Sequence, residues 1–288
     1  MKIREILRDK EVTLSFEVFP PKTVEAMPSV EFATEQIAKL RPDFMSVTYG
    51  AGGSTSKSTM KIADDLQKKY GTPMLAHLTC VSSDREAVRA AVNGYLERGI
   101  DNIMALRGDI PEGGRTDHTF PYAADLIREI REIAPDICIG GACYPEGHVE
   151  CASQREDIRH LKEKVEAGCD FLTTQMFFDN STLYSFLYRI REAGIEVPVI
   201  AGIMPITKRR QVARTVALSG ATIPQRFRTM VDRFGDDEAK MCQAGVIYAT
   251  EQIIDLISNG VGHIHVYTMN RPEIAAGIQA SLSEILRV

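Results

Sequence analysis

A helix-stop pattern that recurs along the chain is the feature that most restricts how this sequence can fold. Residues 97–101, 166–170 and 192–196 each consist of an acidic residue, one variable residue, glycine, a second variable residue and another acidic residue. Residues 256–261 are a looser fourth copy. Glycine just past a helix adopts the left-handed conformation that ends it. A run rich in β-forming residues follows each copy, so the pattern predicts helices that lead directly into strands.

The strand candidates are eight short β-rich runs separated by amphipathic segments. Their first residues lie about 26 to 35 positions apart, except for a last interval of about 66. Ser83 with Glu86 and Ser153 with Glu156 have the spacing of a capping box, which begins a helix. Strands that alternate with helices indicate βαβ units and a parallel sheet. The predicted strands are 13–19, 44–49, 74–79, 102–107, 137–144, 171–177, 197–203 and 263–268.

Eight such units predict an α/β protein folded as a (β/α)8 TIM barrel. The alternative is an open doubly wound sheet, which often carries a glycine-rich nucleotide loop after its first strand. Here the first strand runs into Pro20 and Pro21, and the sequence contains no G-x-G-x-x-G, so the barrel is favoured. The long last interval predicts extra helices between strands 7 and 8, at about 208–219, 224–234 and 236–258. We expect a single catalytic domain over residues 1–288.

Composition and charge restrict the class of protein. The 288 residues are 44% hydrophobic, which is enough to bury a large core without a disulfide or metal. The net charge is −5 and the one basic cluster, 208–210, is expected to be a solvated helix start, so we expect no nucleic-acid partner. No apolar run approaches the length of a membrane span, and the N-terminus lacks the apolar region of a signal peptide. These features, with six dispersed cysteines expected to be reduced, indicate a cytoplasmic protein without membrane association.

Polar side chains occur where nearly every predicted strand ends. A barrel enzyme places its active site at the carboxyl ends of its strands. For any single residue there is an alternative explanation, since strand ends are often polar simply because they meet water. The agreement among the strands favours a site, and its candidates are Glu17, Thr48, His77, Arg107, Asp109, Tyr144, His148, Gln175, Tyr267 and Arg271.

Two carboxylates in this set suggest specific roles. Glu17 lies between Phe16 and Phe19, and partial removal from water favours the neutral form of a carboxyl group, which suits a general acid. The alternative is a glutamate paired with an arginine at the barrel mouth. Asp109 could tune the charge of a bound cofactor, or it could simply pair with Arg107, and the residues alone do not separate these alternatives.

Three further patterns have weaker functional readings. The glycine-rich residues 50–54 could offer backbone N–H groups to a phosphate. Asp157, His160 and Lys164 share one face of a predicted helix and could hold a ribose or pyrophosphate, although a solvated face explains them as well. Cys143, His148 and Cys151 do not match a common zinc spacing, so we expect no metal.

Eight short motifs, in order and over nearly the whole chain, resemble methylenetetrahydrofolate reductases of the short bacterial type. They are residues 15–22 (SFEVFPPK), 46–51 (SVTYGA), 76–80 (AHLTC), 105–109 (ALRGD), 144–148 (YPEGH), 174–179 (TQMFFD), 202–205 (GIMP) and 267–271 (YTMNR). The resemblance implies an FAD enzyme on a (β/α)8 barrel. It would reduce 5,10-methylenetetrahydrofolate to 5-methyltetrahydrofolate by ping-pong hydride transfer from NAD(P)H, as a step of one-carbon metabolism. It also implies a homo-oligomer, in some relatives with partner subunits.

The same resemblance implies roles for individual residues. Glu17 matches the general acid that would protonate N10 of the folate and open its five-membered ring to a 5-iminium cation. Asp109 matches an aspartate near the flavin pyrimidine edge. Substrate-binding positions are Glu17, Gln175, Gln211, Tyr267 and Arg271. Cofactor-binding positions are Thr48, His77, Arg107, Gly108, Asp109, Tyr144, His148, Asp157, His160 and Lys164.

Some features depart from the family pattern or leave a choice open. His160 replaces an asparagine of some relatives, and Thr215 stands where some carry a larger residue that stacks on ligand. One alternative function is a flavin- and folate-binding electron-transfer subunit without its own NAD(P)H activity. Another is a cofactor-free barrel lyase that uses Glu17 as acid or base.

Overall fold

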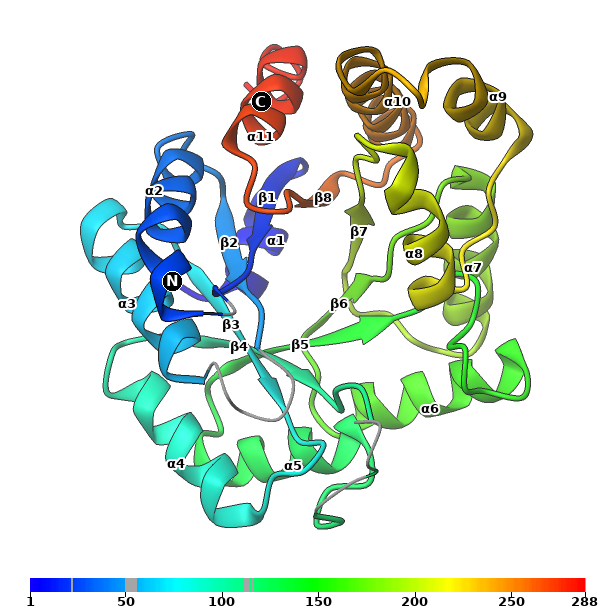
Figure 1. Ribbon diagram of the computed structural model, residues 1–288. Helices are drawn as coiled ribbons and strands as arrows, with labels where there is room; N and C mark the ends of the chain where they lie inside the picture. The colour runs from blue at the N-terminus through cyan, green and yellow to red at the C-terminus, as the bar shows by residue number, and fades with distance from the viewer. Residues whose placement is uncertain (22, 50–55, 111–113, 115–116, 288) are drawn as a thin grey trace.

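Eight parallel strands form a closed barrel surrounded by helices, as the sequence predicts (Figure 1). The computed structural model describes residues 1–21, 23–49, 56–110, 114 and 117–287. Each strand pairs with the next along the chain, and β8 pairs with β1 to close the ring. The strands are β1 (Thr13–Val18), β2 (Phe44–Val47), β3 (Met74–Thr79), β4 (Asn102–Leu106), β5 (Cys138–Cys143), β6 (Phe171–Thr174), β7 (Val199–Ile203) and β8 (His263–Tyr267).

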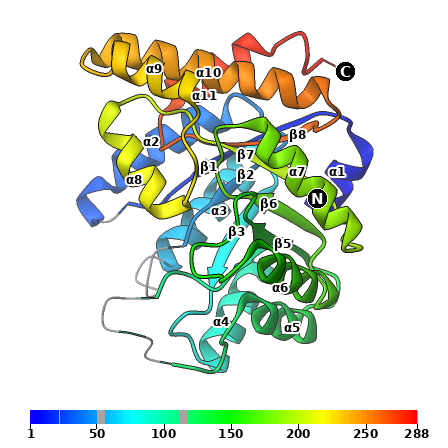
Figure 2. The same cartoon turned by 90° about the vertical axis from the view of Figure 1, so that its right-hand side faces the viewer.

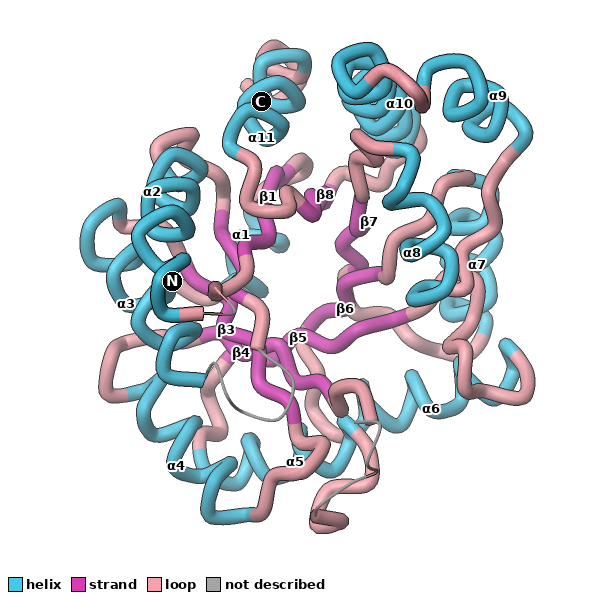
Figure 3. Tube along the Cα trace, viewed as in Figure 1, coloured by secondary structure: helices cyan, strands magenta, loops and turns pink. Residues whose placement is uncertain are grey.

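The helices form an outer layer, visible in the tube of Figure 3. Three of them, α8 to α10, occupy the long interval between β7 and β8, which confirms the predicted extra helices. Figure 2 shows α10 running alongside α11 at one edge of the molecule. The helices are α1 (Ile3–Asp9), the short 3-10 helix η1 (Val24–Ala26), α2 (Met27–Ala38), α3 (Ser56–Tyr70), α4 (Arg85–Leu96), α5 (Ala123–Ile133), α6 (Gln154–Glu166), α7 (Asn180–Glu192), α8 (Arg209–Ser219), α9 (Gln225–Phe234), α10 (Glu238–Ser258) and α11 (Pro272–Ser281).

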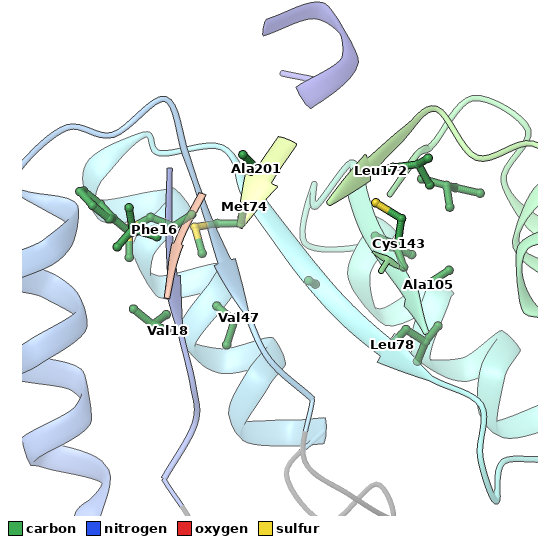
Figure 4. Packing of buried hydrophobic residues seen from close by; sticks show 14 of the residues in the cluster. Phe16, Val18, Val47, Met74, Leu78, Ala105, Cys143, Leu172 and Ala201 are labelled. Carbon is green, nitrogen blue, oxygen red and sulfur yellow. The ribbon is translucent and has the colours of Figure 1, made fainter. Parts of the chain in front are cut away.

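The main hydrophobic core lies between the strands and the helical layer. Alternate strand residues point outward into it, because successive side chains of a strand face opposite sides. Figure 4 shows part of this cluster, including Phe16 and Val18 on β1, Val47 on β2 and Leu78 on β3. The residues between them on each strand face the barrel interior, and they include the candidate site residues Glu17, His77 and Tyr267.

A second, smaller cluster fills the amino end of the barrel interior. It contains Phe44, Phe171 and Ile200 from the strands, together with Ile3 and Leu7 of α1. Gly140 makes room for Phe171, since a Cβ at that position would lie 2.6 Å from the phenylalanine ring. Because apolar side chains fill this end, the candidate site residues Glu17, His77 and Tyr267 lie nearer the carboxyl ends of their strands.

The helix-stop pattern is confirmed in detail. Gly99, Gly168, Gly194 and Gly260 all have positive φ, between 69° and 114°. Ser153 caps α6 by accepting a hydrogen bond from the amide of Glu156, as predicted. The prediction for α4 was wrong by one residue: Asp84, not Ser83, is the cap, because its carboxylate accepts from the Ala87 amide.

Several strands end earlier than predicted. The run 171–177 leaves the β-ladder after Thr174, since the Met176 amide turns to the side-chain oxygen of Gln175. The strands predicted at 13–19, 44–49, 102–107, 137–144 and 263–268 likewise end one or two residues earlier than predicted. Those predicted at 137–144 and 197–203 also begin one and two residues later than predicted. Within the described part of the chain, no helix is long and apolar enough to cross a membrane.

Candidate active site

Glu17 lies near the end of β1 with its side chain directed into the barrel. Its Oε2 atom is 3.7 Å from Nε2 of His77 on β3 and 3.9 Å from Nε2 of His265 on β8. The Ser46 hydroxyl on β2 is 3.5 Å from the same oxygen, the outer limit of a hydrogen bond. The side chain is 20% exposed, so it reaches solvent or a ligand on one side only. Among the described residues its ion-pair neighbours are these histidines, which contradicts the alternative of an arginine pair.

His77 is the nearest titratable neighbour of the Glu17 carboxyl group, at 3.7 Å. Burial lowers the pKa of His77 to about 4, and the nearby Glu17 only partly opposes that effect. The imidazole is therefore neutral at physiological pH. Its Nε2 atom is buried and has no hydrogen-bond partner within the described residues. A buried polar atom without a partner is costly, so this nitrogen is available to a ligand.

Tyr267 spans the barrel interior beside Glu17. Its hydroxyl donates to the backbone oxygen of Thr174 on β6, at 2.6 Å. A Cβ at Gly202 would lie 2.4 Å from that hydroxyl, so glycine is required for the tyrosine to cross. Burial raises the pKa of Tyr267 well above its ordinary value. Because its hydroxyl is already engaged, Tyr267 can offer a ligand mainly the face or edge of its ring.

The structure separates Arg107 from Asp109. The Arg107 guanidinium makes a two-pronged ion pair with Glu150, at 2.6 and 2.8 Å, and this hydrogen-bonded pair raises the arginine pKa. Asp109 is exposed, and no ion pair to it occurs among the described residues. Asp109 thus makes no direct ion pair with Arg107 in the described chain, although its charge contributes to the raised pKa of Arg107. Between them, Gly108 has φ 87° and lies against Thr79, where a Cβ would approach within 3.0 Å.

Two aromatic residues follow β5. The rings of Tyr144 and His148 meet edge to face with centroids 4.6 Å apart. Burial lowers the pKa of His148, and its Nδ1 accepts a hydrogen bond from the Glu150 amide. Burial also raises the pKa of Tyr144. These contacts connect the loop after β5 to Arg107 through Glu150.

The polar face predicted on α6 is only partly directed toward the barrel. The Lys164 ammonium donates to the backbone oxygen of Ala142 on β5, at 2.6 Å, and burial lowers its pKa. Asp157 accepts a weak hydrogen bond from the Cys151 thiol. His160, in contrast, turns toward Glu163 and stacks on Tyr122. The structure therefore brings Lys164 and Asp157 toward the end of β5, whereas His160 contacts Glu163 and Tyr122.

The remaining predicted substrate residues are held by the protein itself. The side-chain oxygen of Gln211 accepts from the amides of Thr207 and Lys208, which caps α8. Arg271 donates to Glu273, to the Thr207 hydroxyl and, at 3.8 Å, to the Cys242 thiol, so each of its three guanidinium nitrogens has a protein partner. The amide nitrogen of Gln211 and the remaining N–H groups of Arg271 are left for a ligand.

Three further predictions concern Thr48, Thr215 and the glycine-rich residues 50–54. Thr48 directly follows β2 and is half-buried, and Thr215 is buried in α8. Residues 50–54, the glycine-rich stretch, lie outside the described residues. Within the described chain, no three His, Cys, Asp or Glu side chains are grouped to hold a metal.

Sequence reasoning missed three buried polar residues beneath Glu17. They are Ser15, Ser46 and His265, each 2% exposed or less. A signal for them exists: Ser15 and Glu17 alternate on β1, as do His263, His265 and Tyr267 on β8. Polar residues at every second position of a strand indicate a polar interior face.

Comparison with known proteins shows which family this sequence matches. A family profile described as methylenetetrahydrofolate reductase matches residues 2–283. The chain belongs to the methylenetetrahydrofolate reductase family. It is accordingly an oxidoreductase, and the resemblance noted in its motifs is confirmed.

Named relatives support this membership. The 5,10-methylenetetrahydrofolate reductase of Pectobacterium carotovorum subsp. carotovorum is 35% identical over 268 residues, covering 93% of this chain and 89% of that protein. Methylenetetrahydrofolate reductase 1 of Schizosaccharomyces pombe is 38% identical and covers 91% of this chain, but the match spans only 44% of the longer yeast protein.

A solved structure also shares the fold. It is described as an uncharacterized protein from Clostridium thermocellum that binds two copies of 5-methyl-5,6,7,8-tetrahydrofolic acid. The match covers 100% of both chains with a TM-score of 0.69, at 15% identity, and shows similarity of fold.

Proposed function

We propose that this member of the methylenetetrahydrofolate reductase family uses FAD and NAD(P)H to convert 5,10-methylenetetrahydrofolate to 5-methyltetrahydrofolate, in two half-reactions that share one site. The observation that carries the proposal is Glu17, a carboxyl group at the barrel mouth with a neutral histidine beside it. Folate reduction needs a proton as well as a hydride, and Glu17 is placed to supply the proton.

Several residues at the mouth fit FAD. Lys164 is a half-buried cation whose protein partner is a neutral carbonyl, so it suits a phosphate. Asp157 suits a ribose hydroxyl, and the unpartnered Nε2 of His77 suits a polar atom of the ring system. Gly108, whose positive φ of 87° suits glycine, is proposed to contact the cofactor through its backbone. When bound, FAD would supply a carrier that takes a hydride from NAD(P)H and gives it to the folate.

The wider cofactor set is proposed on the same grounds. Thr48 and Tyr144 flank this region, and Arg107 and His148 shape it through Glu150. Asp109, exposed and without an ion pair in the described chain, is proposed to hold a negative charge near the flavin. His160 has the weakest support, because its ring is engaged with Glu163 and Tyr122.

Glu17 is proposed to act on folate alone. Protonation of N10 by its carboxyl group would break the N10–methylene bond, leaving the methylene as an iminium on N5 that accepts the hydride. A neutral His77 adds no positive charge that would hold Glu17 ionised. The residues proposed to orient the folate are Tyr267, Gln175, Arg271 through its remaining N–H groups, and Gln211 through its amide nitrogen.

The test is an anaerobic visible spectrum of the purified protein. We expect about one FAD per chain, and loss of flavin absorbance when NADH or NADPH is added, recovering with methylenetetrahydrofolate. Separate titrations with the two nucleotides identify the preferred donor. A protein that stays colourless after incubation with FAD contradicts the proposal. Flavin that neither nucleotide reduces, but that exchanges electrons with folate, identifies the electron-transfer subunit instead.

We also propose a cytoplasmic location. None of the six cysteines forms a disulfide in the structure, and four of them are buried. Reduced, buried thiols are typical of proteins that function in a reducing compartment.

A further inference from the structure

One face of α10 contacts the loops that follow the last strands of the barrel. Gly245 packs against the loop after β7, where a Cβ would lie 1.8 Å from the backbone oxygen of Ile206. Three residues earlier, the Cys242 thiol accepts a hydrogen bond from Arg271, which follows β8. Apart from Glu17, the residues proposed for folate lie on or after β6, β7 and β8. Those proposed for FAD lie on or after β2 to β5 or on α6, and Figure 1 shows α10 across the ring from α4 and α5.

The loop between β6 and α7 is held by two side chains of α10. The Tyr248 hydroxyl donates to the backbone oxygen of Phe178 at 2.7 Å, and the Gln252 amide nitrogen donates to that of Phe177 at 3.0 Å. Positions 245, 248 and 252 are three and four residues apart, which places them on one side of the helix. Phe177 and Phe178 are buried outside any strand or helix, so their backbone oxygens need partners from elsewhere in the protein. Tyr248 and Gln252 supply both partners.

Aromatic packing adds to the hydrogen bond of Tyr248. Its ring meets Phe227 of α9 edge to face, with centroids 4.9 Å apart, and the Phe227 ring lies 5.0 Å from the Phe178 ring. Phe178 and Phe227 are each 3% exposed or less. The loop after β6 is thus fixed through its backbone and through a side chain, and these contacts come from the helices between β7 and β8.

Gln175 is the proposed substrate residue that this loop carries. Its amide still pairs with the backbone oxygen of Cys143 on β5, at 2.7 Å, and its side-chain oxygen accepts from the Met176 amide at 2.9 Å. Because the Met176 amide fixes that oxygen, the direction of the Gln175 side-chain NH2 group depends on the backbone path from Met176 to Phe178. A shift of this path would turn the NH2 group away from its present direction.

We propose that Tyr248 and Gln252 are positioning residues for folate, which orient Gln175 by holding the backbone oxygens of the loop after β6. Neither residue needs to touch the substrate. The role rests on the function proposed above, in which Gln175 orients the folate, but the hold on the loop does not depend on any ligand. A general contribution to the stability of the barrel would instead affect FAD and folate binding alike.

Removal of one hydroxyl tests the proposal on the purified protein. Tyr248→Phe keeps the ring that packs on Phe227 and loses only the bond to the loop. Hydrogen exchange followed by mass spectrometry should be about three- to tenfold faster in a peptide covering residues 175–179, the effect of one net hydrogen bond. Calorimetric titration with tetrahydrofolate, which has no one-carbon group to transfer, should show binding weakened by about the same factor. The dissociation constant of FAD should stay within about twofold of the wild-type value, because its proposed ligands lie on other loops.

Two further variants make the comparison specific. Tyr184→Phe is the matched control, since it removes a hydroxyl that also joins α7 to α10, but donates to the Asp255 carboxylate at 2.7 Å and not to the loop. It should leave exchange in residues 175–179 and the affinity for tetrahydrofolate unchanged. Gln252→Met removes the second donor at similar side-chain length and should reproduce both effects of Tyr248→Phe.

The combination of results decides the role. Unchanged exchange in Tyr248→Phe, or faster exchange without weaker tetrahydrofolate binding, overturns the proposal. Equal losses of affinity for FAD and tetrahydrofolate also overturn it, because they indicate a general effect on stability. If the wild type itself does not bind tetrahydrofolate while exchange responds as expected, the proposed function is wrong, but the hold of α10 on the loop stands.

Discussion

At the residue scale, Glu17 combines partial exposure with an unusually specific set of neighbours. One side of its carboxyl group faces the open barrel mouth, and the other meets Ser46, His77 and His265. None of these neighbours is a permanent cation. An arginine in the same position would hold the carboxylate ionised and make it a poor acid. The strand register, which aligns Glu17 with Ser46 on β2 and Tyr267 on β8, creates this environment.

Replacing the acid should separate the two half-reactions. Glu17→Gln keeps the size and hydrogen-bonding capacity of the side chain but cannot supply an acidic proton. Reduction of bound flavin by NAD(P)H should remain within about tenfold of wild type. Reoxidation by methylenetetrahydrofolate should slow at least about a hundredfold, since general acid catalysis contributes typically 10²–10⁴-fold. Anaerobic stopped-flow absorbance measures both steps.

The pattern of slowing is the informative result. Equal loss in both steps would mean that Glu17 maintains the site and is not the acid. If neither step slows, the acid lies elsewhere. Glu146→Gln is a useful control, because that carboxylate follows β5 but is occupied by Thr222, to whose amide it is bonded at 2.8 and 2.9 Å.

Asp109 offers a second test at this scale. It is exposed and has no ion pair in the described chain, so its charge is free to act on a neighbouring ligand. Asp109→Asn should raise the flavin reduction potential, because it removes a negative charge that opposes the reduced, anionic form. A unit charge at roughly 6 Å is worth about 0.7 to 3 kcal/mol, or about 15 to 60 mV for a two-electron couple.

Redox titration of the purified holoprotein measures this shift. Glu146→Gln is the control for loss of a carboxylate at this end of the barrel, because that carboxylate is engaged by the Thr222 amide, and it should leave the potential unchanged. An unchanged or lowered potential in Asp109→Asn would show that Asp109 lies away from the flavin.

At the scale of elements, α1 is joined to the barrel by the buried Asn102 side chain and by Arg4, which donates to Asp170 and to the Ile137 carbonyl. Asn102, the first residue of β4, accepts from the Ile3 amide at 2.7 Å and donates to the backbone oxygens of Met1 and Met74, both at 3.2 Å. It therefore caps the helix and connects it to two strands. Ile3 and Leu7 of α1 also pack on the hydrophobic cluster that fills the amino end of the barrel.

Removing this side chain should loosen α1 selectively. Asn102→Ala leaves the Ile3 amide and the Met1 and Met74 carbonyls without this partner, at a total cost of about 1 to 3 kcal/mol. We expect a lower free energy of unfolding and faster hydrogen exchange in α1 than in α10. Asn259→Ala, an exposed asparagine at the end of α10, is the matched control and should change little. If the amides of α1 exchange at the same rate in Asn102→Ala as in Asn259→Ala, Asn102 does not cap the helix.

At the scale of the whole molecule, stability depends on keeping His77 neutral. Its pKa is about 4 in the folded chain, against an ordinary value of 6.5. Between pH 4 and pH 6.5, His77 is therefore protonated in the unfolded chain but largely neutral in the folded chain. This contribution to stability is complete above about pH 6.5 and is lost as the pH falls toward 4, by about 3 kcal/mol.

Urea unfolding at several pH values measures the effect. Carboxylates also titrate in acid, so the comparison is between the wild type and His77→Gln, which lacks the titrating ring. The difference between their free energies of unfolding should shift by about 3 kcal/mol in favour of the variant between pH 7 and pH 4. Parallel curves would show that His77 is accessible to protons in the folded protein.

The sequence by itself determined the architecture, because the signals for it are local. Glycines such as Gly99 and Gly168 end helices through their own backbone conformation, and β-branched runs form strands wherever both faces become buried. Because these local signals recur eight times, they favour a closed (β/α)8 barrel. Strand ends were less well predicted, since the last residues of a strand depend on whether its neighbour is long enough to pair with it.

Tertiary structure decided which polar residues act together. Glu17, Ser46, His77 and His265 are separated by up to 248 positions, and only the closed ring, in which β8 pairs with β1, brings them to one carboxyl group. The partner of Arg107 was likewise decided in space, where Glu150 from the next loop takes the guanidinium and leaves Asp109 exposed. Local sequence sets the conformation of each segment, whereas hydrogen bonds and charge pairs between segments depend on register and closure, which only the folded barrel fixes.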